Sequence, residues 1–223
     1  MVKSLRLAVL LALLAARGVP AVEAERVDLE LWCDLDPIVQ EGSAAGSLSR
    51  EEALRRLLEE ARTVLSGMIY GYSFVYTPSD ESRKVAETFR LTARAEIPWG
   101  DERLSVAGTR LDSSRLYALF RYKLDPEQEA WRTAWQSGAA SKASGTGTGN
   151  VFLGYHERTA ALYDAVKEAI RGYLRPGVPN KPREVRGELL LWEVPGTTMS
   201  SGEYRTRVVI RLRIAALTPY RVY

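Results

Sequence analysis

Apolar and polar residues alternate along several short segments of the chain, and two longer segments carry an apolar stripe at helical spacing. The segment 27–33 alternates with period two, as a half-buried strand does. Segment 49–67 instead places apolar residues three and four apart. It begins with Ser49 and Glu52, spaced as a capping box, and ends at Gly67. These patterns predict a strand followed by a well-delimited helix.

The same order of elements recurs later in the chain. The first helix is followed by an apolar strand over 68–77 and an alternating strand over 87–97. A second apolar stripe over 156–175 is followed by strands over 184–194 and 204–217. We therefore expect two related strand–helix–strand–strand units, although any two hairpins share much of this pattern.

The segments between and before these units complete the predicted organisation. A hairpin is expected before residue 123, and Pro126 stands at a favoured first-turn position of a short helix. The stretch "SGAASKASGTGTGN" is rich in Gly and Ser, which predicts a flexible loop. The expected boundaries are a signal peptide at 1–24, a first unit at 25–99, a hairpin and short helix at 100–136, a flexible loop at 137–154 and a second unit at 155–223.

This succession predicts an α+β fold, in which the helices pack on one face of antiparallel sheet.

The N-terminus has the three parts of a secretory leader. Lys3 and Arg6 precede a short apolar run, and small residues end at Ala24, where we expect cleavage. The run is about half of the ~20 residues that span a bilayer, so a retained anchor is the less favoured alternative. We therefore expect an exported protein in the periplasm or cell envelope that is not integral to the membrane after cleavage.

Net charge gives no reason to expect a nucleic-acid partner. The whole chain has a net charge of +3 and a pI of about 9.0, and the leader holds three of its basic residues and one acidic residue. The mature chain would be nearly neutral, whereas nucleic-acid binding calls for a strong positive balance.

Cysteine and histidine are too few for several kinds of site. The single Cys33 and the single His156 exclude zinc sites built from several such ligands. Cys33 is expected to be a buried thiol, with an intermolecular disulfide as the alternative. His156 is expected to be a surface residue at the start of a helix. The phrase "GTGTGN" lacks the Lys-Ser/Thr of a phosphate loop, and no cofactor is expected.

Two sets of charged residues are candidates for a site. Asp34 and Asp36 flank one residue, so on an extended chain they share a face and are weak candidates for a metal or acid–base pair, although turn capping before Pro37 is the preferred interpretation. Arginines on the polar faces of two long strands would form a positive stripe across a sheet, either as a binding surface or as solvated, Glu-paired side chains. The arginines of this stripe are Arg90, Arg94, Arg207, Arg211 and Arg213.

Aromatic residues share one face of the strand at 68–77. They are Tyr70, Tyr72, Phe74 and Tyr76. Core packing is the expected use, and a sugar-stacking or partner surface is the alternative.

The order of elements resembles small modules of Gram-negative envelope proteins, namely the LPP20-type lipoproteins and the N-terminal part of the flagellar assembly protein T family. The similarity covers 27–99 and, more weakly, 155–217, and the chain lacks the acceptor cysteine of the lipoproteins. It implies a non-enzymatic envelope component. We therefore expect an exported, non-catalytic binding or assembly module that contacts an envelope protein or an anionic envelope polymer. The alternatives are a periplasmic hydrolase that uses Asp34 and Asp36, and a carrier of a small ligand between helix and sheet.

Overall fold

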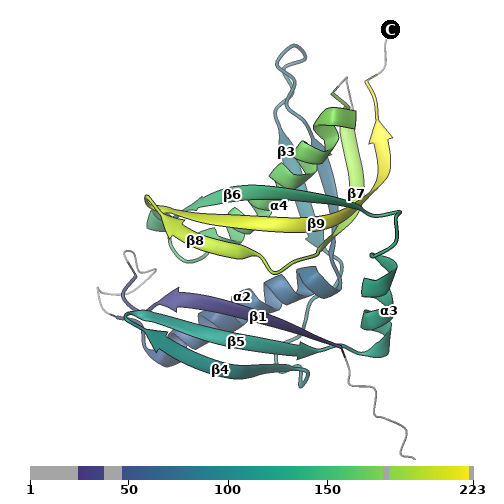
Figure 1. Ribbon diagram of the computed structural model, residues 1–223. Coiled ribbons are helices and arrows are strands. Elements are labelled where there is room, and N and C mark those ends of the chain that lie inside the picture. Colours follow the sequence, from purple (N-terminus) through teal and green to yellow (C-terminus); the bar gives the residue numbers. More distant parts are fainter. Residues whose placement is uncertain (1–24, 38–46, 178–180, 221–223) are drawn as a thin grey trace, which may run out of the picture.

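The computed structural model describes residues 25–37, 47–177 and 181–220 and has the predicted α+β fold (Figure 1). The expected leader and its cleavage site at Ala24 lie outside the described residues. The elements in chain order are β1 (Arg26–Asp34), α2 (Arg50–Ile69), β2 (Tyr72–Thr77), β3 (Thr88–Ala93), β4 (Leu104–Asp112), β5 (Arg115–Lys123), α3 (Pro126–Ala134), β6 (Ser141–Asn150), the 3₁₀ turn η1 (Val151–Leu153), α4 (Glu157–Gly177), β7 (Glu184–Leu191), β8 (Gly196–Ser200) and β9 (Glu203–Thr218).

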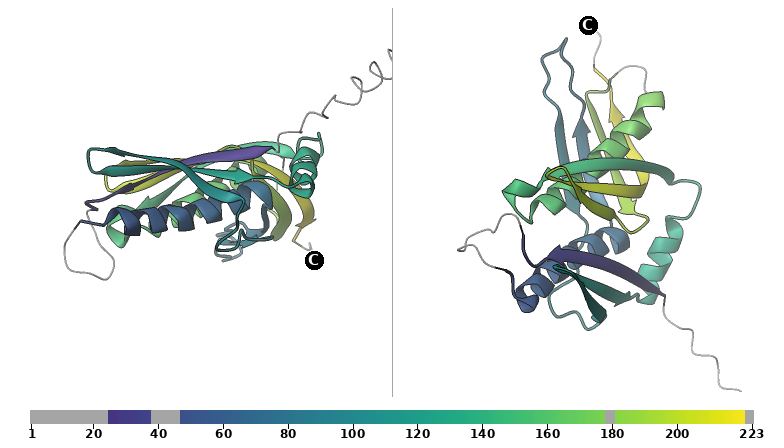
Figure 2. Two further views of the ribbon diagram at one scale, coloured as in Figure 1. Left: turned by 90° about the horizontal axis from the view of Figure 1, so that it is seen from below. Right: turned by 60° about the vertical axis from the view of Figure 1, so that its left-hand side comes forward.

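The strands form two antiparallel sheets. The small sheet has the order β1-β5-β4, and the large sheet has the order β3-β2-β7-β9-β6, with β8 paired to β9. Helix α2 packs against β1, β5 and β7, and α4 packs against β6 and β9. Both long helices lie on the face of the large sheet that carries Leu189 and Leu212, which are register partners. Figure 1 shows α4 behind β6 and β9, and the left view of Figure 2 shows α2 along one side of the strands.

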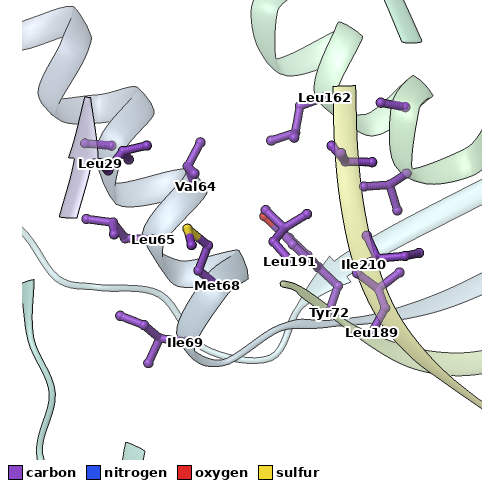
Figure 3. Close-up of a cluster of buried hydrophobic side chains, with 14 of the residues drawn as sticks. Leu29, Val64, Leu65, Met68, Ile69, Tyr72, Leu162, Leu189, Leu191 and Ile210 are labelled. Carbon is purple, nitrogen blue, oxygen red and sulfur yellow. The ribbon is translucent and has the colours of Figure 1, made fainter. Parts of the chain in front are cut away.

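Helix α2 begins where its sequence predicts. The Ser49 side chain accepts a hydrogen bond from the Glu52 backbone N–H, and the Glu52 carboxylate accepts one from the Ser49 backbone N–H. The apolar stripe of α2 is buried and meets the inner faces of both sheets (Figure 3). The aromatic residues Tyr72, Phe74 and Tyr76 are at most 3% exposed, so core packing is confirmed for these three. The placement of Tyr70 on the same strand is wrong, because Tyr70 is the partly buried C-cap of α2 and β2 begins at Tyr72.

The predicted flexible loop at 137–154 is wrong, because most of it is strand β6. Gly145, Gly147 and Gly149 alternate along β6 and face α4. A Cβ on Gly147 would lie 2.1 Å from the backbone nitrogen of Ala165, and one on Gly145 would lie 2.3 Å from the Ala165 carbonyl oxygen. The glycines therefore allow the helix backbone to rest directly on the strand backbone, and this packing orders a segment of high intrinsic flexibility.

Helix α4 also covers the free edge of β6. The backbone N–H of Thr148 donates to the Asp164 carboxylate at 3.2 Å, and that of Asn150 donates to the Glu157 carboxylate at 2.9 Å. These bonds satisfy strand donors that no neighbouring strand pairs, which protects the edge from further pairing.

The first predicted unit is divided between the two sheets. Strand β1 pairs with β5, with Asp28 opposite Arg121 and Asp34 opposite Arg115, whereas β2 and β3 belong to the large sheet. Strand β2 pairs with β7, so the β2–β3 pair and the β7–β9 pair are neighbours in one sheet. Local patterning defines each strand, but it does not reveal that the partner of β1 is β5, which lies far along the chain.

Candidate binding surface

The arginines of the predicted stripe lie on the outer face of the large sheet, opposite α4. Along β9 the residues Tyr204, Thr206, Val208, Ile210 and Leu212 point inward and are buried. The alternate residues point outward, and four of them are arginines: Arg205, Arg207, Arg211 and Arg213. The sequence therefore identified the correct face, because the side-chain period of a strand is two.

Three of the predicted stripe arginines hold α3 and the neighbouring chain against this face. The Arg213 guanidinium lies 4.4 Å from the centre of the Trp135 ring and donates to the Ala134 carbonyl oxygen at 2.6 Å. Arg211 lies 4.7 Å from the centre of the Trp192 ring. Arg94 stacks over Trp131 at 5.0 Å and pairs with the carboxylate of Glu188. These three guanidinium groups are engaged within the chain, so they are not available to a partner.

Two tryptophans of α3 explain this arrangement. Trp131 and Trp135 are four residues apart on one helix face, and their rings meet edge to face at 5.8 Å. Trp135 is fully buried with Leu190 and Ala140. The spacing of these tryptophans was the signal that α3 covers part of the sheet, because a Trp pair at (i, i+4) marks an apolar face on an otherwise polar helix.

The other half of the outer face, over β6, β9 and β8, is exposed. Arg207 is opposite Thr146 of β6 and Gly196 of β8, and Arg205 is opposite Thr148 and Thr198. We call this set of residues, Thr146, Thr148, Thr198, Arg205 and Arg207, the Arg–Thr face. All five are exposed.

The charge of the Arg–Thr face is only partly balanced. Arg205 lies 3.7 Å from the Glu203 carboxylate, and both side chains of this pair are about half exposed. Within the described part of the chain, Arg207 makes no ion pair or side-chain hydrogen bond. Exposed ion pairs contribute little to stability, so the Arg205 guanidinium can exchange its partner at small cost.

Arg90 belongs to a different part of the large sheet. It is exposed on the edge strand β3, and the β2 residue Val75 separates it from Arg186 of β7. Arg186 pairs with Glu184 at 2.7 Å. The sequence thus predicted one stripe, whereas the structure divides its members into three groups. Arg94, Arg211 and Arg213 contact α3 and the neighbouring chain, Arg207 belongs to the Arg–Thr face, and Arg90 lies at the sheet edge.

The predicted pair Asp34 and Asp36 does not form a site. The Asp34 carboxylate accepts a hydrogen bond from the Arg115 Nε at 2.8 Å, across the β1–β5 ladder. Asp36 is exposed beyond the end of β1. Among residues 25–37, 47–177 and 181–220, no three His, Cys, Asp or Glu side chains are grouped as a metal site would require.

A buried polar cluster lies where α2, α4 and β1 meet. Arg158 is 3% exposed, and its guanidinium lies 3.0 Å from the Glu60 carboxylate and donates to the Trp32 carbonyl oxygen at 3.1 Å. The Tyr155 hydroxyl donates to Glu60 at 2.5 Å. The adjoining cavity, which Cys33 lines, measures about 20 Å³. That volume holds one water molecule, so the cluster joins elements and offers no room for a substrate.

Cys33 is buried on β1, as predicted, and its thiol is expected to be unreactive in the folded protein. Burial raises the pKa of the Cys33 thiol to about 11. The thiolate is the reactive form, and its population at pH 8 would be about a hundredfold lower than that of a thiol with a pKa near 9. We expect alkylation by iodoacetamide to be at least a hundredfold slower in buffer than in urea, as followed by mass spectrometry. Equal rates in the two conditions would contradict this assignment.

His156, at the start of α4, is exposed, and its ring lies 3.5 Å from the Glu157 carboxylate. This position agrees with the predicted surface role.

Comparison with known proteins places the chain in a family. A protein-family model matches residues 16–220. The chain belongs to this family. A protein of Treponema pallidum (strain Nichols), described as an uncharacterized protein, is 26% identical to this member over 204 residues, which cover 88% of this chain and 83% of that protein.

The comparisons do not support the resemblance to the LPP20-type lipoproteins or to the flagellar assembly protein T family. No solved structure matches this family member. In the part of the chain that the structure describes, no helix has the length and hydropathy needed to cross a membrane.

Proposed function

We propose that this family member is an exported, non-catalytic module of the cell envelope that binds an anionic partner through the Arg–Thr face. The observation that carries the proposal is the exposed guanidinium of Arg207, which lies beside Arg205, has no ion-pair partner among the described residues and is on a sheet face that neither long helix nor α3 covers. Arginine suits this role because its planar guanidinium binds carboxylates and phosphates with two hydrogen bonds at once.

The Arg–Thr face has the form expected of a surface that meets a macromolecule. Three threonine hydroxyls flank the two arginines in register across β6, β9 and β8, so donors and acceptors lie side by side on extended strands. The partner would present carboxylates or phosphates, as an acidic envelope protein or an anionic envelope polymer does. The structure gives less support to a hydrolase, because the Asp34 carboxylate is held by Arg115.

Site-specific photocrosslinking tests the proposal in cells. A photoreactive amino acid at Thr148 is expected to give one discrete adduct, whereas the same residue at Thr109, an exposed strand position on the small sheet, is expected to give none. Mass spectrometry of the adduct distinguishes a protein from a polymer.

The double variant Arg205→Ser/Arg207→Ser should reduce the Thr148 adduct at least fivefold, because the anionic partner loses both guanidinium groups. The matched variant Arg90→Ser/Arg186→Ser should leave it unchanged, and circular dichroism would verify that both variants fold. An adduct of equal yield at Thr109, or one that survives the first double variant, would refute the proposal.

A further inference from the structure

A sizeable hollow lies at the other end of the large sheet from the Arg–Thr face. It has a volume of about 370 Å³ and is formed by the last turns of α4, the end of β2 and the chain that leads into β7. Figure 1 shows this end of α4 beside β7, at the opposite end of the large sheet from the β8–β9 turn. We call it the α4 groove. Its lining residues are Tyr76, Pro78, Ser79, Glu87, Arg171, Leu174, Arg175, Lys181 and Pro182.

The α4 groove carries more positive charge than its own carboxylate balances. Arg171 pairs with Glu168 at 3.3 Å. Lys181 donates to the Ser79 carbonyl oxygen at 2.7 Å, which is a neutral acceptor. Arg175 is exposed and, in the described residues, has no ion pair or hydrogen bond. Arg175 and Lys181 therefore offer two uncompensated cations to a ligand in the groove.

The single carboxylate that lines the groove, Glu87, already interacts with two neighbouring side chains. Glu87 accepts a hydrogen bond from the Tyr76 hydroxyl at 2.8 Å and lies 3.8 Å from the Lys167 amine. Burial and the hydrogen bond to Glu87 raise the pKa of Tyr76, so its phenol stays protonated and keeps donating. Glu87 is partly exposed, and its free lone pairs can accept hydrogen bonds from a ligand.

The remaining wall of the groove is apolar and partly aromatic. It consists of the Tyr76 ring, the Leu174 side chain and the rings of Pro78 and Pro182. Tyr76 and Leu174 are only 3% and 8% exposed, so this wall closes the hollow but presents little surface for a ring to stack on. A free inorganic anion would leave most of the hollow unfilled, and a purely apolar acid would leave Glu87 without donors.

We propose that the α4 groove binds an acidic sugar, meaning a monosaccharide unit that carries a carboxylate or a phosphate. Its anionic group would pair with Arg175 and Lys181, its hydroxyls would donate to Glu87 and the Ser79 hydroxyl, and its ring would fill the hollow beside Pro78. The volume is within the range of pockets that hold small ligands. This site is distinct from the Arg–Thr face, since the two share no residue.

Titration of ¹⁵N-labelled protein, residues 25–223, tests the assignment by NMR. The probes are glucuronic acid, glucose 6-phosphate, glucose and inorganic phosphate, each added to millimolar concentration at fixed ionic strength. We expect saturable shifts of the Ser79 and Leu174 amides with at least one of the two acidic sugars, and at least tenfold weaker binding of glucose and of inorganic phosphate. The stronger of the two acidic sugars identifies the anionic group.

Two variants distinguish ligand binding in the α4 groove from nonspecific attraction by positive charge. Arg175→Ser should weaken binding of the acidic sugar at least tenfold, while Arg90→Ser, which removes an exposed arginine from the same sheet, should leave it unchanged. Binding of glucose as tight as that of the acids, binding of inorganic phosphate as tight as that of the sugars, or binding unaffected by Arg175→Ser would each overturn the proposal. The absence of shifts with all four probes would overturn it as well, without bearing on the Arg–Thr face.

Discussion

Replacement of Gly147 by alanine is expected to destabilise the protein by about 3 kcal/mol or more, which is the upper end for an overpacked core site. The new Cβ would lie 2.1 Å from the backbone nitrogen of Ala165 and 2.5 Å from the carbonyl oxygen of Ala161. These are backbone atoms of α4, so no side-chain rotation relieves the contact. Urea denaturation followed by far-UV circular dichroism measures the loss.

Gly196→Ala is the matched control for this substitution. Gly196 is also a strand glycine paired with β9, but nothing lies within 4 Å of the position that its Cβ would take. We expect a change of less than about 0.5 kcal/mol, as for surface substitutions that touch no special feature. If the two variants unfolded at the same urea concentration, the close approach of α4 to β6 would be wrong.

Glu60→Gln is expected to lower the free energy of unfolding by about 3 kcal/mol, because it leaves the buried guanidinium of Arg158 without a countercharge. The Arg158 side chain is 2% exposed and that of Glu60 is 11% exposed. The substitution keeps the size of the side chain, so the effect reports the charge. The same denaturation measurement applies.

Two further variants test whether the loss of stability in Glu60→Gln comes from the unpaired charge of Arg158. Glu30→Gln removes one partner of the Arg110–Glu30 pair, whose side chains are 53% and 50% exposed, and should cost less than about 1 kcal/mol. The double variant Glu60→Gln/Arg158→Met should be more stable than Glu60→Gln alone, because it removes the orphaned charge. A double variant less stable than the single one would show that the contacts of Arg158 with Trp32 and its aromatic neighbours outweigh the charge pair.

The roles of the arginines could be predicted from the sequence only in part. Strand periodicity placed Arg207, Arg211 and Arg213 on one face, and this assignment was correct. What covers each position depends on where α3 lies, and α3 is separated from β9 by about 70 residues of chain. Arg211 and Arg213 therefore have the same local pattern as Arg207 and a different role. The α4 groove was missed for the same reason, since Tyr76, Arg175 and Lys181 come from three separate segments.

Local signals in the sequence are sufficient to predict several elements of the fold. The capping box of Ser49 and Glu52 starts α2, the alternation over 27–33 forms β1, and Pro126 opens α3. The tertiary structure alone decided that a Gly- and Ser-rich segment becomes strand β6, that β1 pairs with β5, and that Asp34 is bound by Arg115. A glycine at alternate positions has two physical consequences, high chain entropy and room for a close neighbour. Local sequence reveals the first, and only the packing of α4 on the β6 backbone shows that the second prevails.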